Sequence, residues 1–191
     1  MRESSTDTLE VSVNVLMKST LVAGLLVVGS TLAADAAPKA NLQLTMLTKV
    51  NPQALALWDI GNDAQDDNGN IDAKKIKAAT WTNLVEIGKA IEEGGRTLAT
   101  SNGVIAAAPG AKLQDEAGPG SSKAADVQRY LDAKPADFRK YALELQKTGG
   151  DIVAAATKHD GKKLSEISNA LDEVCENCHM EFWYPQQGSP K

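Results

Sequence analysis

The sixteen residues LSEISNALDEVCENCH at positions 164–179 decide how this chain folds. Apolar side chains recur in this stretch at steps of three and four residues, at Leu164, Ile167, Leu171, Val174 and Cys178. Such spacing is typical of an amphipathic α-helix, which we expect from about residue 162 to residue 181. The stripe runs directly into Cys175-Glu176-Asn177-Cys178-His179, so the buried face of the helix also carries reactive side chains.

The motif Cys-x-x-Cys-His is typical of the covalent attachment of a c-type haem. Cys175 and Cys178 are the only two cysteines in the chain. Residues three apart lie on one face of a helix, so both thiols can form thioethers to the vinyl groups of one porphyrin. His179 follows at once and is placed to ligate the iron. The sequence therefore predicts one covalent haem c.

Other uses of these cysteines fit the sequence less well. A thioredoxin-like pair needs a βαβ context, and a structural zinc site normally needs four ligands. The second histidine, His159, precedes the predicted last helix and lies roughly 30 Å from His179 at about 1.5 Å per residue. We expect His159 to be a solvated turn residue. A plain disulfide or a redox dithiol remains the alternative to haem.

The N-terminal segment predicts export. Lys18 precedes an apolar run from Leu21 to Val28, and Ala34-Asp35-Ala36 is a small-x-small cleavage site. The run is shorter than the roughly 20 residues that a bilayer requires. We expect residues 1–36 to be a signal peptide, with translation starting at Met17 because the preceding segment is acidic, and residues 37–191 to be one periplasmic domain without a membrane span.

Composition and periodicity together predict an all-α fold. Aromatic residues make up only 4% of the chain, so the core must be largely aliphatic, and the net charge of −5 argues against a nucleic-acid partner. Further apolar stripes predict helices from Pro52 to about 64, from 73 or 79 to 100, and from Pro135 to about 156, the last weakened at Gly149-Gly150. Residues 101–134 are expected to be a long flexible connection. Four amphipathic helices indicate an up-down-up-down four-helix bundle with the haem at one end.

A bundle whose haem motif closes the last helix resembles the class II c-type cytochromes, the cytochrome c prime group. The resemblance covers roughly residues 44–184, but only Cys175, Cys178 and His179 match a specific motif. It implies that His179 is the fifth iron ligand and that the sixth position, on the first helix, is empty, apolar or filled by Met. The short first helix and the long connection depart from the family. Family members often pair through their first two helices, but the first helix here shows no legible exposed apolar stripe, so a homodimer stays open.

Topology restricts the sixth position, because the end of the fourth helix lies beside the start of the first in such a bundle. Met46 is the one methionine placed to ligate there, although Met also commonly fills gaps in cores. The alternative is a five-coordinate iron facing Gln53 or Leu57. The resemblance implies a basic residue beside the haem propionates, although each basic residue at that end is more simply interpreted as a surface charge. The aromatic tail 182–184 is expected to pack over the haem edge. The basic candidates are Lys49, Arg96, Arg129 and Arg139.

These residues predict a periplasmic monohaem cytochrome that carries single electrons between redox partner proteins by cycling between Fe(III) and Fe(II). No enzymatic activity is expected. The alternative is a five-coordinate haem module that binds nitric oxide or carbon monoxide. The acidic run 66–72 resembles a calcium loop but has Ile71 where glycine is required, so we interpret it as an ordinary turn.

Overall fold

Helices make up most of the protein, and the all-α class is confirmed. The computed structural model describes residues 38–114 and 116–185, so the predicted signal peptide lies outside the described residues. The elements in chain order are β1 (Ala40–Asn41), α1 (Leu42–Thr45), the π turn η1 (Met46–Val50), α2 (Asn51–Asp63), the 3-10 turn η2 (Ala73–Lys75), α3 (Ala78–Thr100), β2 (Val104–Ile105), α4 (Ala124–Ala133), α5 (Pro135–Thr157) and α6 (Gly161–Phe182). Within these two ranges, no helix combines the length and the apolar character needed to cross a membrane.

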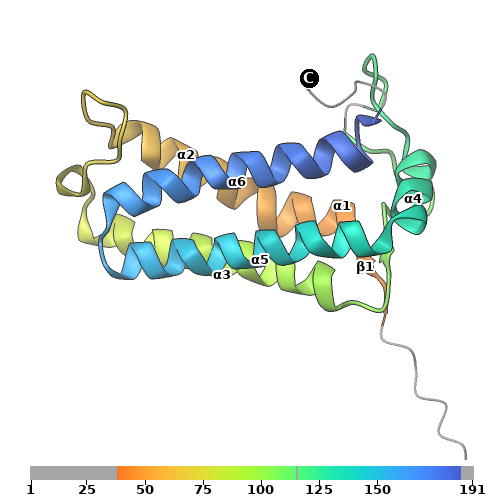
Figure 1. Ribbon diagram of the computed structural model, residues 1–191, viewed down its shortest axis with the longest axis horizontal. Coiled ribbons are helices and arrows are strands. Elements are labelled where there is room, and N and C mark those ends of the chain that lie inside the picture. Colours follow the sequence, from red (N-terminus) through yellow and green to blue (C-terminus); the bar gives the residue numbers. More distant parts are fainter. Residues whose placement is uncertain (1–37, 115, 186–191) are drawn as a thin grey trace, which may run out of the picture. The chain divides into compact units, whose positions relative to one another are not determined.

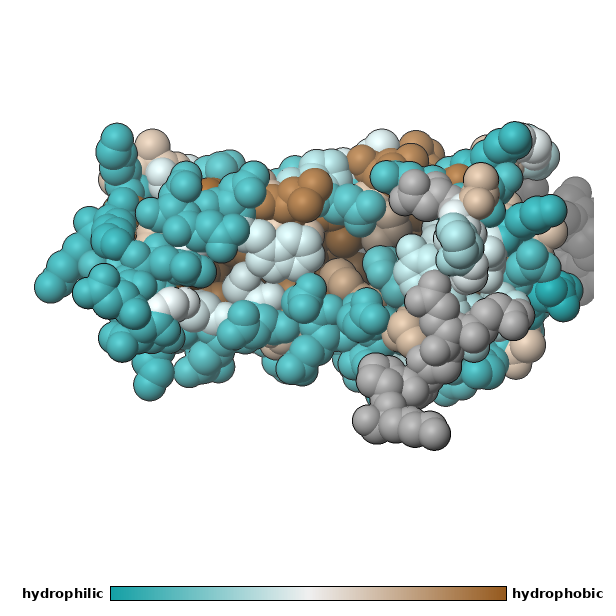
Figure 2. All heavy atoms as spheres, turned by 90° about the horizontal axis from the view of Figure 1, so that it is seen from above, coloured by the Kyte–Doolittle hydropathy of each residue, from teal (hydrophilic) through white to brown (hydrophobic). Residues whose placement is uncertain are grey.

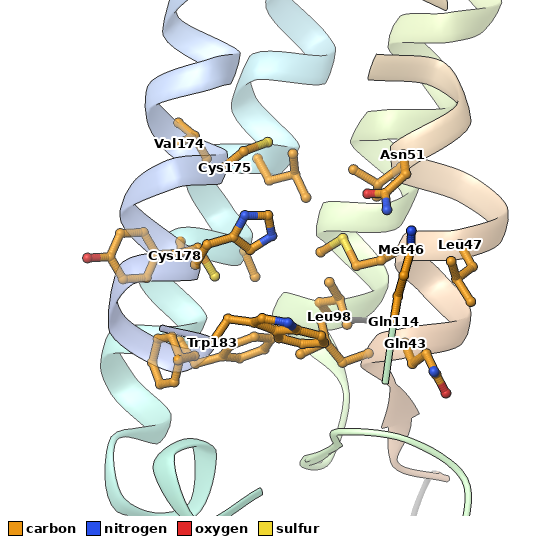
Figure 3. Close-up of a pocket in the computed structure, with 18 residues that line it drawn as sticks. Gln43, Met46, Leu47, Asn51, Leu98, Gln114, Val174, Cys175, Cys178 and Trp183 are labelled. Atoms are coloured by element: carbon orange, nitrogen blue, oxygen red, sulfur yellow. The ribbon is translucent and has the colours of Figure 1, made fainter. Parts of the chain in front are cut away.

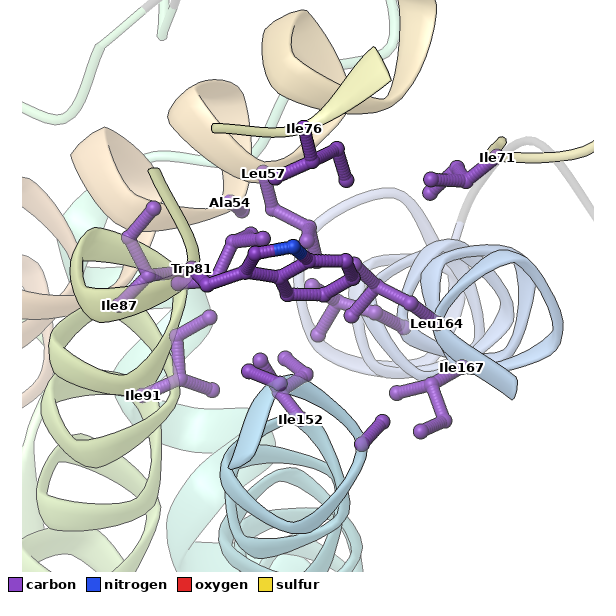
Figure 4. Packing of buried hydrophobic residues seen from close by; sticks show 14 of the residues in the cluster. Ala54, Leu57, Ile71, Ile76, Trp81, Ile87, Ile91, Ile152, Leu164 and Ile167 are labelled. Atoms are coloured by element: carbon purple, nitrogen blue, oxygen red, sulfur yellow. The ribbon is translucent and has the colours of Figure 1, made fainter. Parts of the chain in front are cut away.

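The long helices lie side by side and enclose an aliphatic core. Figure 1 shows α2 and α6 along one side, with α3 and α5 along the other. Trp81 of α3 lies in the middle of a cluster that includes Leu57, Ile152 and Leu164 (Figure 4). The helices α3, α5 and α6 follow the predicted ranges closely, because each has a long apolar stripe that specifies which face is buried.

Glycines bring α3 and α5 into backbone contact. A Cβ added at Gly149 would lie 2.7 Å from the Glu92 Cα and 2.8 Å from the Gly88 carbonyl oxygen. A Cβ at Gly95 would likewise collide with the backbone of Gln146. The weak point that the sequence predicts at Gly149 is therefore a packing site, and α5 continues through it as one helix.

The first helix is longer than the sequence predicts. Helical structure begins at Leu42, capped by the side chain of Asn41, which accepts a hydrogen bond from the Leu44 amide at 3.0 Å. It continues through η1 into α2, so we call residues 42–63 the N-terminal helical run. The sequence prediction is wrong here because proline usually begins a helix, whereas Pro52 follows a π turn inside this one.

The segment 101–134 is more than the flexible connection expected from its small residues. Strand β2 pairs in parallel with β1, aligning Ala40 with Val104. The Gln128 side chain of α4 accepts a hydrogen bond from the Ala106 amide at 2.8 Å and donates one to the Val104 carbonyl at 3.1 Å. The segment thus ties α4 to the start of the N-terminal helical run. The sequence analysis missed α4 because its buried stripe has only two members, Val127 and Leu131.

The turns at Asp66 and His159, at the other end of α6, are held by local hydrogen bonds and packing. Asp66 Oδ1 accepts hydrogen bonds from the amides of Asn68 and Asn70, as expected of an ordinary turn. His159 adopts a left-handed φ of 53° after α5 and stacks on Trp81, with 4.9 Å between ring centroids. His159 therefore has a packing partner, although it is exposed, as expected for a turn residue.

Candidate cofactor site

A hollow opens between α6 and the N-terminal helical run, and the predicted site residues meet in it. Cys175, Cys178 and His179 line one wall, and Met46 lines the facing wall. Figure 3 shows the two cysteines on α6, Met46 opposite them, and Trp183 closing the gap from below. The structure thus brings together all four site residues that the sequence predicts.

The apolar stripe of α6 explains where the cysteines lie. Leu164, Ile167 and Leu171 are buried and fix the helix against the core. One turn further on, Cys175 packs against the large cluster around Trp81, and Cys178 packs against a second cluster around Phe138 and Phe182. Members of both clusters line the hollow, and Met46 contacts both clusters. An apolar group bound in the hollow would join them into one core.

The hollow suits a haem in its chemistry but is narrow. Its walls are mainly apolar, with the polar side chains of Gln43, Asn51 and Gln114 among the lining residues. The enclosed volume is about 120 Å³, which is below the roughly 300–1,000 Å³ of typical ligand pockets. The hollow is also open to solvent, as the depression in Figure 2 shows. A porphyrin held by Cys175 and Cys178 would therefore be only partly enclosed by this hollow.

Burial keeps both thiols protonated. It raises the pKa of Cys175 to about 11, with a further contribution from Asp172. Burial likewise raises the pKa of Cys178 to about 12, with Cys175 and Glu181 adding to the effect. Thioredoxin-like pairs need the opposite shift, because the thiolate is their nucleophile. The arrangement therefore disfavours a redox dithiol as the function of this pair.

His179 has the surroundings of a neutral ligand. Burial against the apolar walls lowers its pKa, and nearby Glu176 partly opposes this shift. The open mouth of the hollow still leaves the residue accessible to solvent. The ring centroids of Trp183 and Tyr184 each lie 6.2 Å from that of His179. A lowered pKa favours the neutral imidazole, which is the form that binds metals.

A polar contact that the sequence analysis missed anchors the last turn of α6. Glu181 accepts hydrogen bonds from Tyr141 Oη at 3.0 Å and from Lys134 Nζ at 2.9 Å. These bonds, that from Lys134 above all, lower the pKa of Glu181. Phe182 packs edge-on against Phe138, at 5.7 Å between centroids. No local pattern marks the partners of Glu181, since they lie 40 and 47 residues away.

The four basic residues considered as propionate contacts do not line the hollow, which agrees with their simpler interpretation as surface charges. Lys49 and Arg96 both pair with Glu93, and Arg129 pairs with Asp126 at 2.5 Å. Arg139 lines a different depression, beside α4. The sequence indicates only at which end of the bundle these four basic residues lie. It does not determine in which direction each side chain points.

The distal residues also differ from those expected. Leu57 is fully buried in the large cluster, and neither it nor Gln53 lines the hollow. Leu47 and Asn51 line it instead. The N-terminal helical run does expose leucines, in contrast to the expectation from the sequence: Leu44 (58%), Leu47 (48%) and Leu55 (58%).

Comparison with known proteins identifies no relative. No family model, no curated protein and no solved structure matches the chain. In residues 38–114 and 116–185, no group of three or more His, Cys, Asp or Glu side chains is arranged to hold a metal ion.

Proposed function

We propose that this protein is a monohaem c-type cytochrome that carries single electrons in the periplasm. Cys175 and Cys178 would hold the haem as thioethers, and His179 would be its axial ligand. The fold would be a four-helix bundle of the class II type, made by the N-terminal helical run, α3, α5 and α6. When bound, the haem supplies the one-electron chemistry by cycling between Fe(III) and Fe(II).

One observation carries this proposal: the two cysteines and the histidine line the same apolar hollow. The raised pKa values of both thiols argue against the competing dithiol function. The chain's own contribution is to supply mainly apolar walls around the site and a lowered pKa of His179, which favours the neutral imidazole that ligates metals. It also fixes the end of α6 through Lys134, Tyr141 and Glu181.

The alternative function is capture of nitric oxide or carbon monoxide at an open sixth position. The placement of Met46 on the wall facing the cysteines favours electron transfer, because a thioether ligand makes the iron low-spin and raises its potential. If Met46 only fills the hollow, the sixth position is left to small ligands. Redox partner proteins follow from the first function and gas ligands from the second.

The first test is covalent haem incorporation. The chain from Met17 is expressed in a bacterium with a c-type haem maturation system, and haem staining is performed after denaturing electrophoresis. We expect one haem per chain in the wild type and none in a Cys175→Ala/Cys178→Ala variant. A folded, exported protein that carries no covalent haem would refute the proposal.

The second test distinguishes the two functions by visible spectra in the ferric and ferrous states, with and without carbon monoxide. For an electron carrier we expect a low-spin spectrum with a sulfur-to-iron band that disappears in Met46→Ala. The band should persist in the control Leu44→Ala, whose side chain is exposed and does not line the hollow. A high-spin wild type that binds carbon monoxide readily would favour the gas-binding function.

A further inference from the structure

The π turn η1 changes which residues of the N-terminal helical run face the core. A regular α-helix rotates by about 100° per residue, and a π turn inserts one extra residue without advancing that rotation. We take the direction of buried Ala54 about the helix axis as the core direction. A regular helix would place Leu47 about 20° from this direction and Met46 about 80° from it. With the insertion, Met46 lies about 20° and Leu47 about 120° from that direction.

The observed burial follows the shifted register. Leu47 is 48% exposed, whereas Met46 packs against both apolar clusters. Leu42 would lie about 120° from the core direction in a regular helix and about 20° with the insertion, and it is only 4% exposed. Leu44, which the insertion places about 180° away, is 58% exposed. Figure 3 shows Met46 directed into the gap and Leu47 on the outer side of the helix.

Pro52 gives the turn a local cause. The Asn51 amide donates to the Met46 carbonyl five residues back, which is the hydrogen bond of a π turn. In a regular helix the Pro52 ring would collide with the carbonyl of Thr48, four residues earlier, and Pro52 has no N–H to offer it. The wider turn before Pro52 avoids this collision.

Gly94 of α3 gives the turn room. A Cβ added at Gly94 would lie 2.7 Å from Val50 Cγ2, closer than Cβ contacts in proteins, with Thr45 and Lys49 atoms at 3.7 Å. The side chains of the π turn therefore pack closely on α3 at Gly94. Lys49 also pairs with Glu93, next to this glycine, at 3.7 Å.

We propose that the π turn, held by Pro52 and Gly94, is a positioning device that directs Met46, rather than the half-exposed Leu47, towards Cys175 and Cys178 as the sixth iron ligand. The naming of Met46 as a ligand rests on the proposed haem function. The register itself does not, and it can be measured without haem. Pro52 and Gly94 are positioning residues, since neither lines the hollow.

The register is tested by nuclear magnetic resonance on the full chain, through the coupling that a hydrogen bond transmits from an amide nitrogen to a carbonyl carbon. We expect a coupling between the Asn51 amide and the Met46 carbonyl. It should be lost in Pro52→Ala and in Gly94→Ala. The matched control is Gly61→Ala in α2, where an added Cβ comes no closer than 3.4 Å to a flexible side-chain end. A wild-type coupling to Leu47, or a Met46 coupling that survives both substitutions, would overturn the proposal.

The consequence for ligation is tested in the haem-loaded protein by exchanging the two residues. Met46→Leu/Leu47→Met keeps the composition and moves the thioether by one position. In this exchange variant we expect complete loss of the sulfur-to-iron band. The band should also be lost in Gly94→Ala, and it should return in Gly94→Ala/Val50→Ala, where the colliding methyl group is removed. A band retained with methionine at position 47 contradicts the proposal. A wild type with haem but no sulfur band rejects ligation by Met46, while the coupling experiment reports on the register separately.

Discussion

Replacing Gly149 by alanine should separate two helices that touch through their backbones. The added Cβ would lie 2.7 Å from the Glu92 Cα and 2.8 Å from the Gly88 oxygen. Both atoms are backbone, so no side-chain rotation relieves the collision and α3 must move away from α5. Overpacking of this kind costs about 1–3 kcal/mol, and the upper end applies to a rigid backbone. Alanine regains about 1 kcal/mol of helix propensity. We therefore expect a net destabilisation of about 2 kcal/mol.

The neighbouring residue supplies a matched control. At Gly150 the nearest atom to an added Cβ is the Glu92 Cδ, 3.9 Å away. Gly150→Ala should therefore show only the propensity gain, a stabilisation of about 0.5–1 kcal/mol. The two variants should differ by about 3 kcal/mol, which corresponds to roughly 6–12 °C in Tm for a domain of this size. Thermal and urea unfolding followed by far-ultraviolet circular dichroism measures this difference. Equal stability of the two variants would show that α3 and α5 are not in backbone contact at Gly149.

Three further predictions concern the core, the thiols and the β2 segment. Phe182 is 1% exposed, so Phe182→Ala should lower the free energy of unfolding by about 3–5 kcal/mol. The control Leu143→Ala, at a side chain 46% exposed, should change this free energy by about 0.5 kcal/mol or less. Similar effects of the two substitutions in urea unfolding would contradict the assigned burial. In haem-free protein, alkylation of Cys175 and Cys178 by iodoacetamide should be slow at neutral pH and still accelerate above pH 10, because their pKa values are raised to about 11 and about 12. An alkylation rate that levels off near the pKa of a free thiol would disprove the burial. The raised pKa values also mean that the contribution of the two thiols to stability is complete below the thiol pKa of the unfolded chain. This contribution declines as the pH rises through the pKa values of the folded protein. Gln128→Ala removes both hydrogen bonds from this side chain to the backbone of Val104 and Ala106. Limited proteolysis should then cut residues 101–114 faster while the helix content stays unchanged. An unaltered cutting rate would mean that other contacts hold this segment.

Local patterns in the sequence predicted much of the fold. The stripes of α3, α5 and α6 are long, and their periodicity depends only on neighbouring residues in the chain. The same holds for Cys175, Cys178 and His179, whose spacing on one helix already places them on adjoining positions of one wall. The short helix α4 and the strand pair were missed because two or three apolar residues do not establish a period.

Met46 shows what local sequence patterns cannot predict. The sequence placed Met46 at the correct end of the fold, but its neighbour Leu47 is equally near, and only the register decides which of the two points towards the cysteines. For the same reason the sequence left open whether Lys49, Arg96 and Arg129 meet a propionate or are surface charges, since their ion-pair partners are set by how each helix is rotated.

The sequence by itself determined the helical class of this protein, three of its long helices and the clustering of two thiols and an imidazole on one face, because each of these depends on spacings within a few turns of one helix. The tertiary structure alone decided that Met46 faces the cysteines, that glycines join α3 to α5, and that Glu181 is held by Lys134 and Tyr141. These features arise from contacts between residues 40 or more positions apart, where the rotation and separation of whole helices determine which side chains meet.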